Sequence, residues 1–336
     1  MPETTCSRRE FLATGTTVLA GTALLGHIST AVASSSGTSM IAANSSEIRL
    51  LQFTDLHFFA GISHEPEISE IQRQQTFDDM RRLVDLTRPD LLAVTGDFWH
   101  ENPDGRGLEF LHFSVEKVAD LGIPWVFTWG NHDHLDDYDK GHKALAQARH
   151  SLYGGTSKNG GHYVTRIKDR SDRILFELFC LNTEERGVGE GIKNFLRQML
   201  SQEQSDQKRP MRLGAFHIPL RQYRDVWENG NAFGVKGEEI CFEEEDGSAL
   251  PLLREAGIQA VICGHDHTND YSGFAEGIEL IYGRASGYNG YGNQTLKKGA
   301  KLYRIDPATA ALHWESYLPD GTRWHPGPTE RRSIAP

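Results

Sequence analysis

Five short polar segments each follow directly after an apolar run, and this repeated placement constrains the fold more than any other feature of the chain. Short apolar runs are typical of strands that are buried in a parallel sheet. In open α/β sheets, ligands bind beyond the carboxyl ends of the strands, so polar residues that follow several strands are expected to converge on one site. The five segments are Asp55-Leu56-His57, Gly96-Asp97, Gly130-Asn131-His132-Asp133, His217 and Gly264-His265-Asp266-His267.

The first three apolar runs alternate with segments whose apolar residues recur at helical spacing. Strands are predicted over residues 48–54, 91–95 and 124–129, with helices over residues 68–87 and around residues 108–118 between them. Such a β-α-β-α-β series favours parallel strands joined by right-handed crossovers. The other predicted elements are helices over residues 139–150 and around 192–200, and strands over residues 162–167, 173–181, 212–216, 259–263, 276–283, 300–305 and 311–317. The pattern therefore predicts an α/β fold with two sheets packed between helices.

The first 33 residues are predicted to be an export signal, outside the fold. Arg8 and Arg9 precede a mildly apolar run, and Ala31-Val32-Ala33 offers the small residues that a signal peptidase accepts, as in a twin-arginine (Tat) signal. The alternative is a membrane anchor, but glycines dilute the apolar run, which is shorter than the ~20 residues a span needs. A Tat signal implies a bacterial protein that the Tat machinery exports, already folded, to the periplasm or beyond.

Three further segments complete the predicted organisation of the chain. Residues 34–46 are rich in serine, which indicates a flexible linker. Residues 47–318 are predicted to form one domain, because the candidate site residues run from Asp55 to His267 and any division between them would split the site. Residues 319–336 are rich in proline and glycine, and an irregular tail is expected there.

Charge and composition exclude several classes of function. The formal net charge is −11, and no basic stripe interrupts the acidic balance, so a nucleic-acid backbone is not expected to be the main partner. After the predicted signal, no apolar run is long enough to span a membrane. The cysteines beyond the signal are Cys180, Cys241 and Cys263, an odd number without CxxC spacing, which argues against a disulfide framework or a zinc knuckle.

The polar segments offer a set of side chains that can bind metal ions. The set contains imidazoles, carboxylates and one amide, and it lacks a thiolate, which suits Zn, Mn or Fe ions. Asp97 carries two carboxylate oxygens and can bridge two cations. The candidate metal ligands are Asp55, His57, Asp97, Asn131, His217, His265 and His267.

The order of these segments resembles the calcineurin-like metallophosphoesterase superfamily. The resemblance covers roughly residues 48–270 and rests on Asp-x-His, Gly-Asp, Gly-Asn-His-Asp, a single His after a strand, and Gly-His-x-His. Phe216-His217-Ile218-Pro219 and the run from Gly264 to Asp270 look like the purple-acid-phosphatase-related branch of that superfamily. The resemblance implies a four-layer α/β/β/α sandwich with two central mixed sheets.

The same resemblance implies a role for each site residue. Asp55, His57 and His267 would hold one metal ion, Asn131, His217 and His265 would hold the second, and Asp97 would bridge the two. A hydroxide between the ions would attack the phosphorus, because the cations lower the pKa of water. His132 would contact the phosphate and protonate the leaving group, and Asp133 would orient the ring of His132.

The chain departs from the purple acid phosphatases at one position. Those enzymes carry Gly-Asp-x-x-Tyr, whereas His100 stands in place of the tyrosine here. We therefore expect no tyrosinate ligand and no purple colour, and we expect His100 to lie at the surface or behind the ligands rather than on the substrate. In the glycine-rich segment of residues 283–292, Tyr288 and Asn289 could reach the substrate, although turn structure explains the glycines equally well.

These features predict a dinuclear metallophosphatase that acts on phosphomonoesters. A phosphodiesterase or nucleotide hydrolase is the alternative among enzymes, because the same two-metal core serves both reactions. An inactive metal-containing binding protein is a more distant alternative. Such a protein often lacks a ligand or the catalytic histidine, and all of them are present here.

Overall fold

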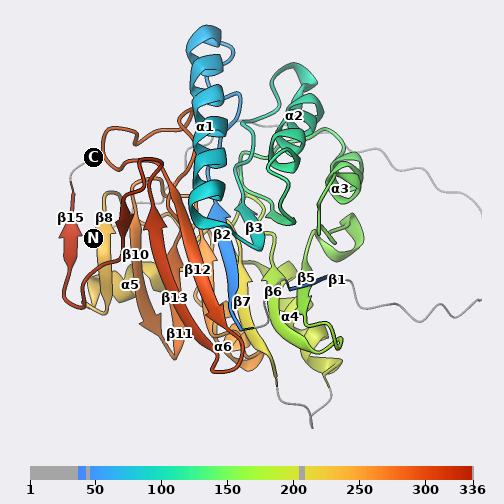
Figure 1. Cartoon of the computed structure of the whole chain (residues 1–336), viewed down its shortest axis with the longest axis vertical. Coiled ribbons are helices and arrows are strands. Elements are labelled where there is room, and N and C mark those ends of the chain that lie inside the picture. Colours follow the sequence, from blue (N-terminus) through green and yellow to red (C-terminus); the bar gives the residue numbers. More distant parts are fainter. Residues whose placement is uncertain (1–36, 43–45, 204–208, 335–336) are drawn as a thin grey trace, which may run out of the picture.

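The computed structural model describes residues 37–42, 46–203 and 209–334, and the predicted export signal lies outside them. Within these residues the chain forms two mixed sheets that are packed face to face. Helices cover the outer face of each sheet, as Figure 1 shows. The predicted four-layer α/β/β/α architecture is confirmed.

The smaller sheet carries the first three predicted strands side by side. Strands β2 (Ile48–Phe53), β3 (Leu91–Thr95) and β4 (Trp125–Thr128) pair in parallel, and helices α1 (Pro66–Thr87) and α2 (Gly107–Ala119) form the crossovers. The sheet has the order β14-β13-β12-β2-β3-β4. Its other strands, which are antiparallel to their neighbours, are β12 (Ala300–Asp306), β13 (Ala311–Tyr317) and β14 (Arg323–Trp324).

The larger sheet contributes the remaining site residues through two parallel neighbours. Strands β7 (Met211–Ala215) and β9 (Ala260–Cys263) lie next to each other in the order β1-β5-β6-β7-β9-β11-β10-β8-β15. The other strands are β1 (Gly37–Ile41), β5 (Tyr163–Lys168), β6 (Ile174–Cys180), β8 (Ala232–Lys236), β10 (Asp270–Ala275), β11 (Ile278–Tyr282) and β15 (Arg331–Ser333).

Strict alternation along the strands divides the core into layers. In β9, Ala260 and Ile262 face the smaller sheet, whereas Val261 and Cys263 face the outer helices. The outer layers are formed by α1, α2 and α3 (Tyr138–Gln147) on one side, and by α4 (Glu190–Ser201), α5 (Gln222–Glu228) and α6 (Ala249–Glu255) on the other. Side chains alternate between the two faces of a strand with a period of two residues. A strand that is buried on both faces therefore has an uninterrupted run of apolar residues in its sequence.

The predicted boundaries of the domain are wrong at both ends. Part of the segment that was predicted to be a linker forms β1, which pairs in parallel with β5, and Thr38 Oγ1 donates a hydrogen bond to the carbonyl of Leu152. The predicted irregular tail contains β14 and β15, and β15 pairs in parallel with β8. Exposed edge strands alternate or lack apolar residues, so composition alone did not distinguish them from loops.

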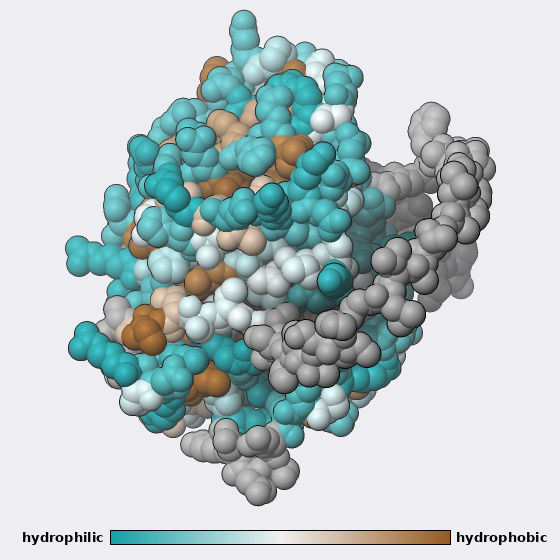
Figure 2. Space-filling view, turned by 90° about the vertical axis from the view of Figure 1, so that its right-hand side faces the viewer, coloured by the Kyte–Doolittle hydropathy of each residue, from teal (hydrophilic) through white to brown (hydrophobic). Residues whose placement is uncertain are grey.

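None of the helices formed by the described residues is both long enough and apolar enough to cross a membrane. The exposed large apolar side chains lie in small groups, such as Ile68 and Ile71 on α1 and Phe233 and Phe274 on the paired strands β8 and β10. Figure 2 shows one face of the molecule, on which apolar residues occur in small groups among hydrophilic ones. Scattered exposed apolar residues of this kind are normal for a protein surface.

A buried ion pair links the two sheets. The carboxylate of Asp270 on β10 lies 2.5 Å from Nζ of Lys301 on β12 and 2.6 Å from Nε of Arg284, and it accepts a hydrogen bond from Ser316 on β13. Asp270 and Lys301 are fully buried. Burial alone would raise the pKa of Asp270, but Arg284 and Lys301 outweigh it and hold this pKa below its usual value.

We expect Asp270→Asn to lower the free energy of unfolding by about 3–5 kcal/mol, because it leaves the buried charge of Lys301 without its partner. The native pKa of Asp270 is lowered, so the wild type keeps this stabilisation above the unfolded pKa and loses it as pH falls through the native pKa. Urea unfolding at pH 7 and at pH 3–4 measures both effects. Asp172→Asn is the matched control, since its exposed pair with Lys168 is expected to contribute at most about 1 kcal/mol. A change of less than 1 kcal/mol at pH 7 for Asp270→Asn would contradict the prediction.

Candidate metal centre

All the predicted metal ligands lie at the carboxyl ends of strands, where the two sheets meet. The ligands come from both sheets: β2, β3 and β4 of the smaller one, and β7 and β9 of the larger one. Backbone hydrogen bonds join the ends of neighbouring strands, from Asp55 to Gly96 at 3.2 Å and from Gly264 to His217 at 3.0 Å. The structure therefore gathers residues that are up to 212 positions apart in the sequence, as from Asp55 to His267.

Asp55, His57 and His267 form the first group of ligand atoms. Nε2 of His267 lies 3.4 Å from Oδ1 of Asp55 and 3.1 Å from Nε2 of His57. All three side chains are buried, with exposed fractions of 3% or less. This group matches the first ligand set that the resemblance implied.

His217 is the centre of the second group. Its Nε2 lies 3.1 Å from Oδ1 of Asn131, 3.3 Å from Nδ1 of His265 and 3.1 Å from Oδ2 of Asp97. The ring is held from behind, because its Nδ1 donates a hydrogen bond to the carbonyl of Thr95 at 2.8 Å. This bond leaves Nε2 with the lone pair that a metal ion requires.

One oxygen atom belongs to both groups. Oδ2 of Asp97 lies 3.3 Å from Nε2 of His57 and 3.1 Å from Nε2 of His217. The other oxygen of this carboxylate accepts a hydrogen bond from the backbone N–H of His132 at 2.9 Å. The side chain is thereby fixed with a single oxygen between the two groups, which is the position of a bridging ligand.

The spacing of these atoms fits metal ions. Ligand atoms that lie about 2.0–2.2 Å from one ion, at angles of about 90–110°, are about 2.8–3.6 Å apart. The contacts described for His57, His217, His265 and His267 fall between 3.1 and 3.4 Å. Burial lowers the pKa of His57 and lowers that of His265 to about 3, which favours the neutral form that binds a metal, whereas at His217 burial is outweighed by Asp97 and Asp55, which raise the pKa to about 10 in the absence of a cation. Each group therefore has the spacing and the chemistry to hold one ion.

Four of the ligand residues have a left-handed backbone conformation. The φ angles are 55° at Asp55, 46° at His57, 51° at Asp97 and 78° at His265. Side chains rarely adopt this region, and each such residue costs about 1–3 kcal/mol. The backbone is strained where it turns the ligand side chains toward the centre.

Glycines in the motifs allow a close approach of backbone to ligand. A Cβ atom at Gly130 would lie 2.2 Å from the backbone nitrogen of Asp97, and one at Gly264 would lie 1.9 Å from Oγ1 of Thr54. Both distances are far below van der Waals contact, and the neighbouring atoms are held in strand ends. The glycines that precede Asn131 and His265 are thus required by packing, which explains their presence in the motifs.

His132 lies beside the two groups. Its ring is held by Glu101, a residue that no motif in the sequence indicated. Its Nδ1 donates a hydrogen bond to Oε1 of Glu101 at 2.6 Å, which directs Nε2 away from this carboxylate. Burial lowers the pKa of His132, but Asp97 and Glu101 outweigh it and raise this pKa above its usual value. A charged ring that is fixed at one nitrogen can donate a proton at the other.

The predicted contact between Asp133 and the ring of His132 is wrong. The Asp133 carboxylate instead accepts hydrogen bonds from the backbone N–H groups of Asp97, Phe98, Trp99 and Gly130, at 2.7 to 3.2 Å. Two adjacent side chains in a tight turn point in different directions, so adjacency did not bring the carboxylate to the ring. Asp133 therefore links the loops that follow β3 and β4. Glu101, rather than Asp133, orients the ring of His132.

Two further histidines belong to the surroundings of His132. Nδ1 of His134 lies 2.6 Å from Oε2 of Glu101, and Nε2 lies 2.8 Å from Oε1 of Glu185. The ring of His100 stacks on that of His132, with centroids 4.6 Å apart, and its Nδ1 lies 3.0 Å from Nδ1 of His57. His100 therefore lies between His132 and the candidate ligand His57, and it is only partly buried.

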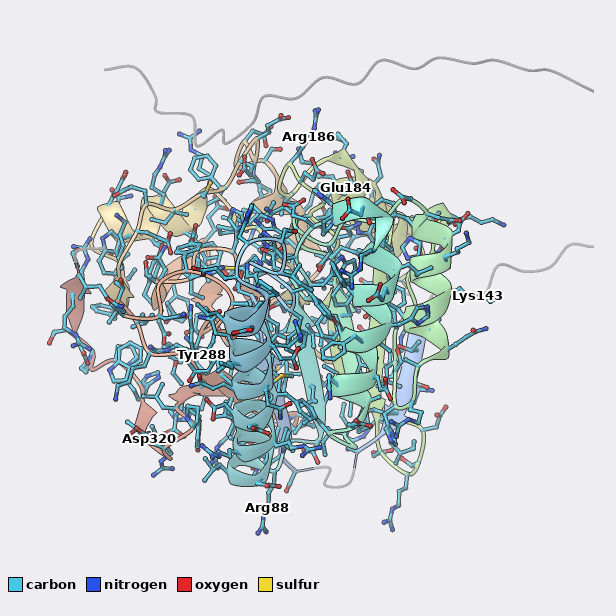
Figure 3. The ribbon with its side chains drawn as sticks, turned by 90° about the horizontal axis from the view of Figure 1, so that it is seen from above. Arg88, Lys143, Glu184, Arg186, Tyr288 and Asp320 are labelled. Carbon is cyan, nitrogen blue, oxygen red and sulfur yellow. The ribbon has the colours of Figure 1, made fainter. Side chains whose placement is uncertain are left out.

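The glycine-rich segment of residues 283–292 lies against the metal centre, but through a different residue from those predicted. Tyr288 donates a hydrogen bond to Asp79 on α1 at 2.8 Å, and Figure 3 shows it beside this helix. Asn289 donates hydrogen bonds to the carbonyls of Ala60 and Ser69. The ring of Tyr291 stacks on the ligand His267, with centroids 3.9 Å apart.

The fold and the site together define a class of protein: an α/β/β/α sandwich with two groups of potential metal ligands at the junction of its sheets. The model of one family, the calcineurin-like phosphoesterases, matches residues 48–269. The chain belongs to this family.

Curated relatives and solved structures agree with this membership. "Probable inactive purple acid phosphatase 28" of Arabidopsis thaliana is 24% identical over 80% of this chain and 77% of its own length. The tartrate-resistant acid phosphatase type 5 of Rattus norvegicus is 22% identical over 71% of this chain and 73% of its own. The structure of purple acid phosphatase PPD1 from yellow lupin seeds shares the fold, with a TM-score of 0.51 and 16% identity over 84% of this chain and 53% of its own.

Proposed function

We propose that the protein is a dinuclear metal-dependent phosphomonoesterase. The observation that carries the proposal is the single carboxylate oxygen of Asp97, which lies within 3.3 Å of a ligand nitrogen in each of two buried groups. Two ions held side by side in this way would lower the pKa of a water molecule and polarise the phosphoryl oxygens of a substrate.

The residues of the chain have different roles in the proposed site. Asp55, His57 and His267 would hold one ion, Asn131, His217 and His265 the other, and Asp97 both. Their burial excludes bulk water, which strengthens the attraction between the site and a phosphate. Zn, Mn and Fe suit this mixture of imidazole and carboxylate ligands.

His132 is the general acid in this proposal. Glu101 accepts the hydrogen of Nδ1, so the proton at Nε2 is the one that is available to the oxygen of the leaving group. His132 also contributes positive charge next to the place where the phosphoryl group would lie. Proton donation by a fixed side chain of this kind typically accelerates a reaction by about 10²–10⁴-fold.

Monoesterase activity is proposed because two of the relatives are named as acid phosphatases or purple acid phosphatases. A phosphodiesterase on the same two-metal core is the alternative. Other relatives carry names that describe them as inactive phosphatases. This chain retains every ligand that the resemblance implied and a histidine in the position of the acid, which supports activity here.

We also propose that the protein is exported by the Tat machinery, to the periplasm or beyond, on the basis of residues 1–33. Folding and metal binding would then precede export. Expression of the full chain with Arg8 and Arg9 changed to lysine, followed by cell fractionation, tests this. Retention of the variant in the cytoplasm supports Tat export, and unchanged export of the variant contradicts it.

The experiment that tests the activity compares two matched esters. The purified chain is assayed for its content of Zn, Mn and Fe, and the same sample is given phenyl phosphate and diphenyl phosphate. We expect kcat/KM to be at least about 100-fold higher for the monoester, a difference of about 2.7 kcal/mol in transition-state binding. Chelation of the metals should abolish turnover, and re-addition of one of them should restore it. A preference for the diester would favour the phosphodiesterase, and the absence of turnover with two ions bound would favour a binding protein.

A further inference from the structure

A cavity of about 470 Å³ opens beside the proposed general acid. One of its walls is formed by His100 and Glu101, the residues that contact the ring of His132 by stacking and by hydrogen bonding. The same His100 contacts the metal ligand His57. The cavity is therefore one residue away from both His132 and His57, which contact its wall but do not line it.

The lining of the cavity contains one carboxylate, that of Glu101, among apolar side chains, small polar residues and imidazoles. Phe59, Ile62 and Pro103 contribute apolar surface, and His64, Asn102 and His134 contribute groups that can form hydrogen bonds. The ring of Phe59 is held in place, because Phe110 stacks on it at 4.1 Å between centroids. A cavity of this volume, with the Phe59 ring fixed in its wall, has room for a ring-shaped group.

The charge around the cavity is negative. The described residues that line it include no lysine or arginine. Behind the lining, Asn102 donates a hydrogen bond to Asp136 at 2.8 Å, and Glu185 lies 2.8 Å from the ring of His134. Arg73 lies over the Phe59 ring, where it is paired with Glu70 on the same helix. The pKa values of His132 and His134 are raised beside Glu101, so these rings offset part of the negative charge, but the three carboxylates of Glu101, Asp136 and Glu185 outnumber them. A leaving group with its own negative charge would thus meet an excess of carboxylates.

We infer that this cavity, defined by Phe59, Ile62, His64, Asn102, Pro103 and His134, receives the leaving group and selects phosphate esters of ring-shaped hydroxyl compounds that carry no negative charge. The inference rests on the proposed function. Sugar and aryl phosphates belong to this class. Pyrophosphate, nucleoside triphosphates and nucleic-acid ends do not, because their leaving groups are anions.

Two substrates of the same shape test the inference. In 4-carbamoylphenyl phosphate the leaving group is neutral, and in 4-carboxyphenyl phosphate it carries one negative charge. We expect kcat/KM of the metal-loaded wild type to be at least about tenfold higher for the neutral ester, which is about 1.4 kcal/mol. A ratio within twofold of unity would overturn the inference.

A lysine placed in the cavity should reverse this preference. His64 is exposed at the mouth of the cavity, and His64→Lys is expected to lower the ratio at least fivefold by raising kcat/KM for the charged ester. Ser63→Lys is a second variant in the same loop, should the first one melt at a lower temperature. His112→Lys is the matched control, because His112 is exposed on α2 and does not line the cavity. The control should leave the ratio unchanged.

The outcomes separate this inference from the proposed function. Turnover of both esters at equal rates, with no effect of His64→Lys or Ser63→Lys, would overturn the assignment of the cavity and leave the phosphomonoesterase standing. Failure to hydrolyse either ester with two ions bound would contradict the proposed function and, because the inference rests on it, the inference as well.

Discussion

Replacement of Asp97 by asparagine is expected to lower kcat by about 10³-fold, since it removes roughly 4 kcal/mol of stabilisation by the two ions. The same variant should hold fewer than two metal ions per chain. Asparagine keeps the shape of the side chain and one ligand oxygen, but it lacks the charge that Oδ2 of Asp97 shares between His57 and His217. Without that charge, two cations would repel each other across a buried site.

Metal analysis, kcat and the melting temperature of one sample are the measurements for Asp97→Asn. Asp85→Asn on the exposed face of α1 is the matched control and should equal the wild type in all three. A variant that keeps two ions per chain and a kcat within tenfold of the wild type would show that Asp97 does not bridge the ions.

Replacement of His132 by glutamine is expected to have the second-largest effect, and its size should depend on the leaving group. For phenyl phosphate, whose leaving group needs a proton, kcat should fall by about 10²–10⁴-fold. For 2,4-dinitrophenyl phosphate, whose leaving group departs as an anion, the fall should be less than tenfold. The reason is that only the first reaction uses the proton that Glu101 helps to hold on the ring of His132.

The comparison of leaving groups distinguishes two roles for His132. An equal loss of rate for both esters would mean that His132 binds the phosphate and donates no proton, which would contradict the proposal. Metal content should stay at the wild-type level, because His132 belongs to neither of the two proposed ligand groups but to a separate cluster with His100 and Glu101. His112→Gln, an exposed change of the same kind, should alter neither rate.

The strands and ligands of the metal centre could be predicted from the sequence because each signal is local. A buried strand such as residues 91–95 is visible in the sequence as one apolar run. Asp97, the candidate ligand that follows this strand, must therefore lie at the end of the sheet. Helix α1 was equally clear: its buried stripe includes Phe77, Met80 and Leu83, and it ends at Arg88, before a proline. The resemblance also predicted two groups among the seven candidate ligands, and the structure brings the side chains of each group together.

The partners of His132 could not be predicted, because they depend on how loops meet. Glu101 lies 31 residues from His132 in sequence, with a left-handed φ of 61°, and no spacing rule links the two. The short elements α5, α6 and β8 were missed for another reason. Each has only 5 to 7 residues, too few for a periodic pattern to stand out from chance. The edge strands β1 and β15 lack the apolar run on which strand prediction relied.

The left-handed backbone at Asp55, His57, Asp97 and His265 has a consequence for how such a chain can change over generations. Each of these residues destabilises the fold when no metal ion is bound, so substitution by glycine at any of them would relieve strain in the metal-free protein. Under the proposed function, selection for catalysis would oppose such substitutions. A lineage that no longer needed hydrolysis could become more stable by losing its ligands, and could keep the same scaffold for other purposes.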